Sequence, residues 1–393
     1  MKNIVLLGCT GSIGTSTLEV IDGNPDLFSI FLLSAKTNYN KLMKQCKKFN
    51  PKYVYLEDKT SASVLKEFCL KEKITVEVIL EEEKYFELIS SSPVDIVVAG
   101  IVGVAGLKPV YHAINNGKRL LLANKESYVS AGEYLNSLAS EKGASIFPID
   151  SEHSAIHQCI ASSSEMHGDV SEIILTGSGG PFLNTSLKKF NKITPEEAIA
   201  HPVWNMGKKI SVDSATLMNK GLELIEAKWL FDMEDDCIDL VIHPEGMVHS
   251  LVEFRDKSII AQISVPDMKI PIAYGLGFPS RIHSGAKKLV LTDIASLTFL
   301  KPNFEKFPCL NLAKETLKLG GTAPSLLNAA NEEAVHAFLE NRIAFNEIPE
   351  IISYVMNKIP VGAVKDLDSV LEADKIARST ARKRMKLKNG IIA

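Results

Sequence analysis

The 393-residue chain has no CxxC cysteine pair and no apolar run long enough to cross a membrane. Its six cysteines are scattered, which argues against a disulfide framework or a structural zinc site and favours free thiols in a reducing compartment. The longest uncharged apolar run, Ile96 to Leu107, is too short and too rich in glycine to span a bilayer. Residues 1–4 lead directly into a predicted strand, so we expect no signal or transit peptide. These absences predict a soluble, cytoplasmic protein without a membrane partner.

The chain also lacks a strong excess of charge of either sign. Its 44 basic and 47 acidic residues leave a net charge of −3 at pH 7, which gives no general attraction to nucleic acid. Residues 375–388 hold seven basic residues and no acid, but a helix C-terminus favours cations in any case, so we predict no nucleic-acid partner. The length predicts two or three domains of ordinary globular composition.

Short apolar segments alternate with helix-length segments over the first 150 residues. Such alternation indicates right-handed crossovers and a doubly wound, Rossmann-type parallel sheet. The predicted strands are residues 3–7, 28–35, 53–56, 75–79, 94–99, 120–123 and 145–149.

Three glycines, at positions 8, 11 and 14, stand between the first predicted strand and the first predicted helix. Glycines there permit a tight turn and a close approach of the backbone to a pyrophosphate, so we favour nucleotide binding over an ordinary turn. NAD-selective folds place an acidic residue at the end of the second strand. Here residues 34–38 contain no acid and one lysine, Lys36, which suits the 2′-phosphate of NADP; the alternative is a solvated surface lysine.

Polar residues follow the last two predicted strands of this sheet. Asn124, Lys125 and Glu126 open a helix after one strand, where ligands of doubly wound sheets bind, although Asn124 could simply cap that helix. Asp150, Ser151 and Glu152 follow the next strand. These two carboxylates could cap a helix or turn together onto a hard cation, and this stretch by itself favours the cap.

Three segments of the middle region suggest a second site. Residues 176–182, Thr-Gly-Ser-Gly-Gly-Pro-Phe, form either an anion-binding nest or an ordinary turn. Residues 201–207, His-Pro-Val-Trp-Asn-Met-Gly, fit a mobile lid or a loop pinned by a buried tryptophan. In the helix that follows, Asn219, Lys220 and Glu223 share a face away from the apolar stripe; a Lys–Glu pair at this spacing is usually solvated, but asparagine and glycine inside the helix favour a site.

The remaining patterns complete the predicted architecture. Strands at 172–176, 240–242, 248–254 and 259–265 indicate an α+β middle domain, residues 266–308 read as a connector, and helices are predicted at 310–319, 325–339, 348–357 and 367–386. His153 and His157 lack a third soft ligand, so we interpret them as structural. The predicted domains are a cofactor domain (1–150), a catalytic α+β domain (151–277) with a flap at about 201–211, a connector (278–308) and a C-terminal helical domain (309–393).

Together these blocks resemble the 1-deoxy-D-xylulose 5-phosphate reductoisomerase family over essentially the whole chain. The resemblance rests on GCTGSIG (8–14), LANKES (122–127), PIDSEH (148–153), TGSGGPF (176–182) and HPVWNMGKKISVDSATLMNKGLE (201–223). It implies a homodimeric NADPH- and Mg²⁺- or Mn²⁺-dependent enzyme that converts 1-deoxy-D-xylulose 5-phosphate to 2-C-methyl-D-erythritol 4-phosphate in isoprenoid precursor biosynthesis. It also implies a retro-aldol/aldol rearrangement, followed by reduction of an aldehyde intermediate by NADPH.

The resemblance further implies a role for each matching residue. Asp150, Glu152 and Glu223 would ligate one divalent ion. The pyrophosphate would bind Thr10, Gly11, Ser12 and Ile13, the nicotinamide end would border Asn124 and Glu126, and the lid would touch the cofactor through Gly207. The carbonyl and hydroxyls of the substrate would be positioned by Lys125, Ser151 and Asn219, with help from Lys220. The phosphate of the substrate would bind Ser178, Ser214, Asn219 and Lys220. A flap that contains His201 and Trp204 would close over it. The family commonly has a glycine and then a basic residue before Asn38; here the order is Lys36, Thr37, Asn38, and we expect Lys36 to contact the 2′-phosphate.

Two other functions stay open at this point. A different NADPH-linked aldehyde or keto-acid dehydrogenase would need no group of three carboxylates. An NADP-sensing regulatory protein would leave the carboxylates, the flap and the Gly-Ser-Gly-Gly turn unexplained.

Overall fold

The computed structural model describes residues 1–161, 169–204 and 206–388, and within them the chain forms two compact units. Unit 1 contains Met1–Ser127, Leu135–Ser154 and Asp267–Lys287, and unit 2 contains Tyr128–Tyr134, Ala155–Pro266 and Lys288–Ala393. Asn205 of the predicted flap lies outside the described residues. Within the described chain, every helix is too short or too polar to cross a membrane.

Unit 1 is built on a seven-stranded parallel sheet with the strand order β4-β3-β2-β1-β5-β6-β7. The order reverses between β1 and β5, and in such folds ligands bind at the carboxyl ends of the strands near this reversal. The strands are nearly continuous apolar runs because both faces of the sheet are covered. They are β1 (Lys2–Leu7), β2 (Phe28–Ala35), β3 (Tyr53–Leu56), β4 (Glu77–Ile79), β5 (Ile96–Ala99), β6 (Arg119–Leu122) and β7 (Ser145–Pro148). All seven predicted strands are thus confirmed, with shifts of at most two residues at either end.

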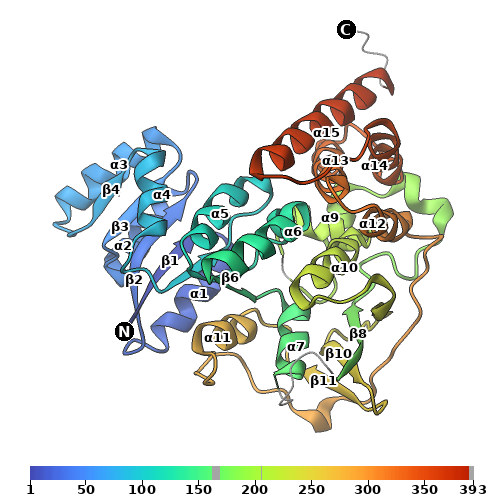
Figure 1. The fold of residues 1–393 in the computed structure, drawn as a ribbon, viewed down its shortest axis with the longest axis horizontal. Coiled ribbons are helices and arrows are strands. Elements are labelled where there is room, and N and C mark those ends of the chain that lie inside the picture. Colours follow the sequence, from blue (N-terminus) through green and yellow to red (C-terminus); the bar gives the residue numbers. More distant parts are fainter. Residues whose placement is uncertain (162–168, 205, 389–393) are drawn as a thin grey trace. The chain divides into compact units, whose positions relative to one another are not determined.

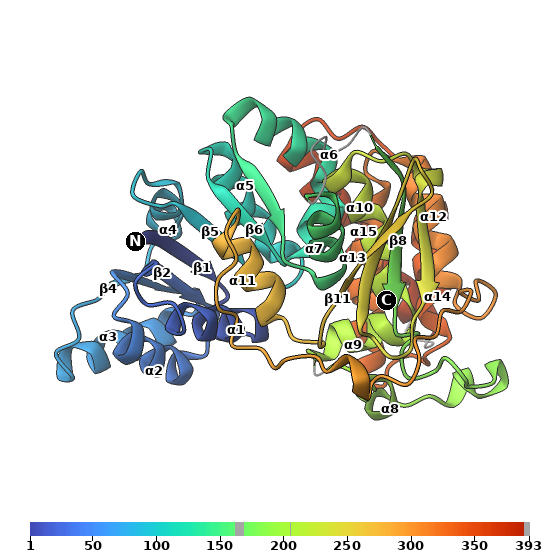
Figure 2. The same ribbon diagram turned by 90° about the horizontal axis from the view of Figure 1, so that it is seen from below.

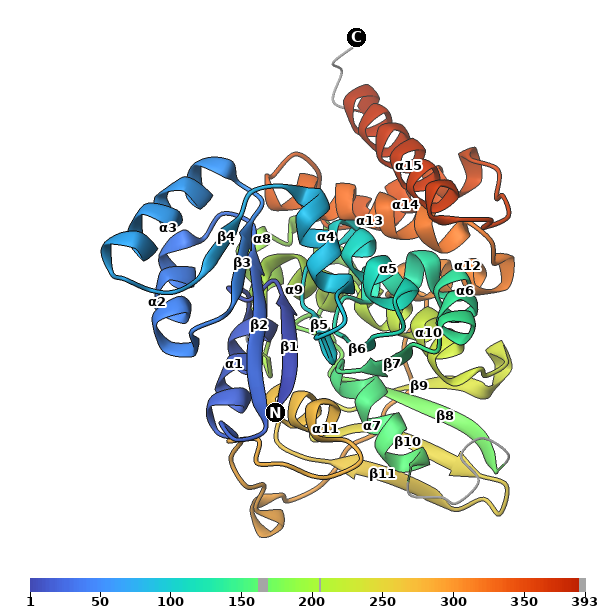
Figure 3. The ribbon, with the colours of Figure 1, turned by 60° about the vertical axis from the view of Figure 1, so that its left-hand side comes forward.

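Helices cover both faces of this sheet. Figure 3 shows α1, α2 and α3 on one side of the strands and α4 and α5 on the other, as right-handed crossovers require. The helices are α1 (Ser12–Asp22), α2 (Tyr39–Phe49), α3 (Lys59–Lys71), α4 (Glu82–Ser90), α5 (Leu107–Asn115) and α6 (Lys125–Lys142), the last divided between the units. The predicted Rossmann-type fold class is confirmed.

One helix of unit 1 comes from the segment that we expected to be a connector. Helix α11 (Lys269–Gly277) packs against α1, and its Ile272 and Leu276 are fully buried. The Arg119 guanidinium holds its C-terminal end by donating hydrogen bonds to the carbonyl oxygens of Gly275 (2.6 Å) and Phe278 (3.0 Å). The prediction of a connector beginning at Pro266 was therefore wrong, because proline in a first helical turn and glycine at a close packing contact do not prevent a helix.

Unit 2 contains a four-stranded mixed sheet with the order β11-β10-β8-β9. Strands β8 and β9 are parallel, and β10 is antiparallel to both β8 and β11. Helix α10 packs against β8, β9 and α12, and α10, β8 and α12 are labelled in Figure 2. The strands are β8 (Val170–Gly177), β9 (Ile238–Ile242), β10 (Val248–Phe254) and β11 (Ile259–Ile263); the helices are α7 (Ser151–Ile160, divided between the units), α8 (Pro195–Ile199), α9 (Lys208–Ala215) and α10 (Met218–Phe231).

Four helices end the chain and gather in one group (Figure 1). They are α12 (Pro308–Leu319), α13 (Ala323–Leu339), α14 (Glu347–Lys358) and α15 (Leu367–Lys388), and all four were predicted. Short 3₁₀ helices occur at Val104–Gly106, Leu187–Lys192, Asp235–Cys237 and Leu291–Asp293.

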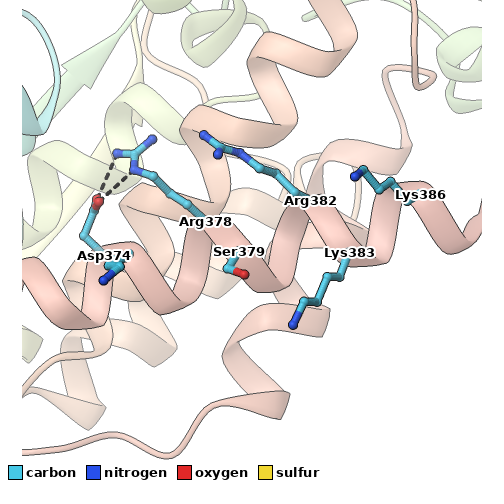
Figure 4. Close-up of a pocket in the computed structure, with 7 residues that line it drawn as sticks. Asp374, Arg378, Ser379, Arg382, Lys383 and Lys386 are labelled. Atoms are coloured by element: carbon cyan, nitrogen blue, oxygen red, sulfur yellow. Dashed lines mark hydrogen bonds and ion pairs between the residues drawn. The ribbon is translucent and has the colours of Figure 1, made fainter. Parts of the chain in front are cut away.

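The basic stretch predicted at 375–388 lies on α15, where Figure 4 shows Arg378, Arg382, Lys383 and Lys386 lining a pocket. Two of its arginines are held by acids. Arg378 pairs with Asp374 (2.7 Å) and Glu332 (2.6 Å), and Arg382 pairs with Glu333 (2.7 Å). Part of this positive charge therefore joins α15 to α13 within the helical group.

Candidate active site

The glycine turn of unit 1 accepts no larger residue at two of its positions. Gly8 has φ +76°, and a Cβ there would lie 2.7 Å from the carbonyl oxygen of Gly100. At Gly14 a Cβ would lie 2.5 Å from the carbonyl oxygen of Gly8 and from the Cα of Cys9. The backbones of the turn, of β5 and of α1 thus meet directly, as a dinucleotide-binding turn requires.

The N-terminus of α1 is open to a ligand. No side chain caps it: Gly11 is the N-cap residue, and the first turn carries no acid. Gly11 and Ser12 are exposed, and Thr10 and Ile13 are half-buried. The free N–H groups of a helix start bind phosphate groups well, so the four predicted pyrophosphate residues fit this group.

The predicted 2′-phosphate residues lie at the end of β2. Lys36 has a side chain that is 75% exposed, and its Nζ lies 3.8 Å from the Glu57 carboxylate. Thr37 is exposed, and Asn38 caps α2 by accepting a hydrogen bond from the Lys41 backbone N–H (3.1 Å).

Asn124, Lys125 and Glu126 are buried where β6 leads into α6. The Asn124 amide donates hydrogen bonds to the carbonyl oxygens of Ile101 and Gly103 and accepts one from the Ser127 backbone N–H (2.7 Å). Asn124 is therefore a helix cap, which was the alternative to a ligand-binding role in the sequence analysis. Its amide also fixes the loop after β5.

Asp150, Ser151 and Glu152 lie where β7 leads into α7, at the same edge of the sheet as Lys125. The Lys125 ammonium lies 2.7 Å from the Asp150 carboxylate, in a pair whose side chains are 5% and 13% exposed. Asp150 also accepts a hydrogen bond from the Glu152 backbone N–H (3.2 Å), and the Ser151 hydroxyl donates to the Glu152 carboxylate (2.5 Å). Asp150 is thus a partial cap, but a nearly buried carboxylate paired with a buried lysine is more than a cap needs.

In unit 2, Asn219, Lys220 and Glu223 form one hydrogen-bonded group on α10. Glu223 is fully buried and accepts hydrogen bonds from the Asn219 amide (2.5 Å) and the Lys220 ammonium (2.6 Å). The Lys220 side chain is only 8% exposed, so this Lys–Glu pair is not the solvated pair that its spacing usually indicates. The N-cap residue of the helix, Leu217, is a non-glycine residue with φ +58°, a strained conformation of the kind that is common at functional sites.

The Gly177–Gly180 turn lies directly beside this group. A Cβ at Gly177 would lie 3.1–3.2 Å from the aliphatic carbons of Lys220, so the lysine side chain passes over the turn. Gly180 has φ +64° and lies against the backbone of Ser214, whose carbonyl oxygen would be 2.5 Å from a Cβ. The turn therefore lies between the Lys220 side chain and the Ser214 backbone.

His201 of the predicted flap is bound to this turn. Its Nδ1 accepts hydrogen bonds from the backbone N–H groups of Val203 (3.1 Å) and Trp204 (2.8 Å), so its proton is on Nε2. The Nε2–H then donates to the Ser178 hydroxyl oxygen (3.0 Å), which also accepts from the Gly180 backbone N–H (3.3 Å). The Ser178 hydroxyl proton is consequently left to donate to a ligand.

Trp204 and Gly207 complete the described part of the flap. Trp204 is half-buried, with its ring 6.1 Å from that of His249. Gly207 is exposed at the N-cap of α9, and a Cβ there would meet nothing within 4 Å. Neither the backbone conformation nor a contact with the described residues therefore requires a glycine at position 207.

Two histidines beside the Gly177–Gly180 turn should titrate far below the ordinary value. Burial, aided by the Lys220 charge, lowers the pKa of His201 to about 4; burial, with Lys220 and His243 nearby, lowers the pKa of His249 to about 4. Unfolded histidine binds its proton at about pH 6.5, so folding stability should fall as the pH drops from about 6.5 to about 4. NMR titration of the imidazole resonances should show two midpoints near pH 4; midpoints near 6.5 would contradict the assigned tautomer and burial.

Several residues beside the candidate site of each unit were not singled out from the sequence. Asp213 is buried and pairs with Lys209 (2.7 Å) and with the amide of Asn331 on α13 (2.8 Å), which holds the helix that carries Ser214. His249 lies beneath Trp204, and Lys41 reaches the glycine turn. The one available signal was the position of Asp213 next to Ser214 in a buried helix.

The doubly wound sheet and its glycine turn are those of a dinucleotide-dependent class of enzyme, and the Gly177–Gly180 turn beside Lys220 suits an anionic group. Three family models match the chain: "1-deoxy-D-xylulose 5-phosphate reductoisomerase" over residues 4–132, that family's C-terminal domain over 146–231, and "DXP reductoisomerase C-terminal domain" over 263–380. The chain belongs to the 1-deoxy-D-xylulose 5-phosphate reductoisomerase family.

Curated and solved relatives agree with this assignment over nearly the full length. The reductoisomerase of Paraburkholderia xenovorans (strain LB400) is 47% identical over 97% of this chain and 95% of its own. A DOX-P reductoisomerase structure in complex with NADPH, fosmidomycin and magnesium superposes with a TM-score of 0.94, at 40% identity and 99% coverage of both chains. The Zymomonas mobilis enzyme in complex with NADPH has a TM-score of 0.91, at 40% identity, covering 98% of this chain and 99% of that one.

Proposed function

We propose that this protein catalyses the NADPH- and divalent-metal-dependent conversion of 1-deoxy-D-xylulose 5-phosphate to 2-C-methyl-D-erythritol 4-phosphate in isoprenoid precursor biosynthesis. The observation that carries this proposal within the family is the position of Lys220. Its buried side chain passes over Gly177 and ends on Glu223. Lys220 thus links the Gly177–Gly180 turn, which suits a phosphate group, to the Glu223 carboxylate, which suits a metal ion. A sugar-phosphate substrate of a metal enzyme requires both.

Asp150, Glu152 and Glu223 are proposed to hold one Mg²⁺ or Mn²⁺. Each offers a carboxylate oxygen as a ligand atom, and hard divalent cations prefer such all-oxygen sites. When bound, the ion would polarise the substrate carbonyl and stabilise negative charge that develops on oxygen. The Lys125 ammonium, which pairs with Asp150, and the Ser151 hydroxyl, which donates to Glu152, are proposed to contact the carbonyl and hydroxyl oxygens of the substrate.

The phosphate of the substrate is proposed to bind Ser178, Ser214, Asn219 and Lys220. Support comes from the Ser178 hydroxyl, whose oxygen accepts from His201 and so leaves its proton to donate, from the buried Lys220 ammonium and from the consecutive positive-φ glycines 179 and 180. The phosphate is remote from the reacting carbons, so its binding energy can order the His201–Trp204 flap and exclude water.

NADPH is proposed to bind the glycine turn through Thr10, Gly11, Ser12 and Ile13. The turn fits a pyrophosphate because glycine alone fits at positions 8 and 14, and because α1 has no capping side chain. Lys36, Thr37 and Asn38 are proposed to lie by the adenosine end, and Asn124, Glu126 and Gly207 by the nicotinamide, which delivers hydride to the aldehyde.

A homodimer is proposed from an edge strand of unit 2. Among the described residues, strand β11 is at the edge of its sheet beside β10 and exposes Ile259 (51%), Ile260 (41%) and Ile263 (41%). An apolar edge strand left open is an aggregation hazard, and a second copy of the chain would cover it. We also propose the division into cofactor (1–150), catalytic (151–277), connector (278–308) and helical (309–393) domains, except that α11 belongs to unit 1 with the cofactor sheet. A cytoplasmic location is proposed because it suits six cysteines that form no disulfide.

A turnover assay tests the proposed reaction. NADPH oxidation should require both 1-deoxy-D-xylulose 5-phosphate and Mg²⁺ or Mn²⁺, and EDTA should abolish it until excess metal is added. Oxidation that survives EDTA would favour another NADPH-linked dehydrogenase. NADPH binding without any oxidation under these conditions would favour an NADP-sensing protein.

A further inference from the structure

Lys41, in the first turn of α2, reaches across to the glycine turn of unit 1. Its Nζ donates hydrogen bonds to the backbone carbonyl oxygen of Thr10 (2.9 Å) and to the hydroxyl of Thr15 (2.6 Å). Thr15 in turn donates to the carbonyl oxygen of Gly11 (2.7 Å). The ammonium is thus fixed on the turn and has three N–H donors, two of which these contacts use.

The surroundings of Lys41 are electropositive. Helices α1 and α2 both begin at this edge of the sheet, and neither has an acid in its first turn. A lysine in the first turn of a helix lies against the positive end of the helix dipole, which is unfavourable unless an anion is bound nearby. The charge of Lys41 conflicts with the electrostatic preference of the first turn of α2, and no gain in packing compensates for it. Such a conflict indicates a ligand-binding role.

Lys36 is less well placed for the same role. Its Nζ is 3.8 Å from the Glu57 carboxylate, and its side chain is 75% exposed. An exposed ammonium with an acid beside it offers little net attraction to a phosphate group. Lys41 is half-buried and has two uncharged oxygens as its hydrogen-bond partners.

We propose that Lys41, held on the glycine turn by Thr10 and Thr15, binds the 2′-phosphate of NADPH and selects it over NADH. This inference rests on the proposed function, because it concerns the cofactor of that reaction. The 2′-phosphate belongs to the adenosine ribose, which in this fold class lies between the glycine turn and the end of the second strand. The Asn38 side chain accepts a hydrogen bond from the Lys41 backbone N–H. This contact keeps the segment at the end of β2 close to Lys41.

Direct binding of the two nucleotides tests the role of Lys41 without turnover. NADPH and NADH fluorescence is titrated with the wild-type protein and with Lys41→Met, in the absence of metal and sugar phosphate. We expect Lys41→Met to weaken NADPH binding by about 10- to 100-fold, the usual value of one charge-assisted hydrogen bond, and to leave NADH binding within about threefold. Lys41→Arg should recover most of the NADPH affinity.

The matched control is Lys48→Met, an exposed lysine of the same helix that pairs with Asp22 (2.8 Å) and should change NADPH affinity by less than about threefold. Equal losses of NADPH and NADH in Lys41→Met, with an unchanged unfolding temperature, would overturn the proposal and make Lys41 a support of the turn. A selective loss of NADPH in Lys36→Met would overturn it as well. A wild-type protein that does not prefer NADPH would instead contradict the proposed function.

Discussion

Replacement of Glu223 by glutamine should lower kcat by at least about 1,000-fold and weaken Mn²⁺ binding, with NADPH affinity unchanged within about threefold. A metal-bound oxygen contributes several kcal/mol to the stabilisation of developing charge, and each 1.4 kcal/mol is a factor of ten in rate. Glutamine keeps the shape and can still accept from the Asn219 amide, but it removes the negative charge that a divalent ion requires. Electron paramagnetic resonance of unbound Mn²⁺ measures the metal affinity, and the steady-state rate of NADPH oxidation measures kcat.

Glu223→Gln should also destabilise the protein, because the Lys220 ammonium is only 8% exposed and Glu223 is its partner. Removal of one partner from a buried pair commonly costs about 3–5 kcal/mol, so kinetics must be measured well below the unfolding temperature of the variant. The control is Asp235→Asn, which removes the acid from the Lys228 pair at the other end of α10. It should leave kcat and Mn²⁺ binding unchanged. Normal Mn²⁺ binding by Glu223→Gln would show that Glu223 is not a ligand.

The unit 1 sheet could be predicted from sequence because its signals are local. The run from Phe28 to Ala35 is apolar except for Ser29 and Ser34 and is found as β2 with the same bounds. The glycine turn was predicted because its spacing and its place between a strand and a helix are visible in the sequence. Helix α11 was missed because its stability comes from partners far along the chain, above all Arg119, whose contacts with Gly275 and Phe278 leave no local pattern.

The candidate site shows the same limit. Spacing placed Asn219, Lys220 and Glu223 on one helical face, but it could not show that the Lys–Glu pair is buried by packing from other elements. Lys41 was not singled out for a related reason. Its proposed role in binding the 2′-phosphate depends on its contacts with Thr10 (2.9 Å) and Thr15 (2.6 Å), which lie 31 and 26 residues earlier in the chain. Side chains that act through tertiary contacts have no periodicity of their own.

Replacement of Gly14 by alanine should weaken NADPH binding by at least about 100-fold and lower the free energy of unfolding by roughly 1–3 kcal/mol, the usual cost of overpacking. Gly14 lies inside α1, where alanine would ordinarily stabilise a helix by about 1 kcal/mol. Here the new Cβ would lie 2.5 Å from two backbone atoms of the glycine turn, so the turn itself must move. Movement of the turn displaces the N–H groups that hold the pyrophosphate.

Gly23→Ala, at the other end of the same helix, is the matched control for Gly14→Ala. Gly23 has φ −75°, and a Cβ there would have its nearest neighbour at 3.5 Å, an ordinary contact. This variant should keep its NADPH affinity and its free energy of unfolding within about 0.5 kcal/mol. Nucleotide fluorescence and urea unfolding measure both quantities. If Gly14→Ala bound NADPH normally, the pyrophosphate could not lie on this turn, because the substitution cannot be made without moving backbone that the dinucleotide would contact.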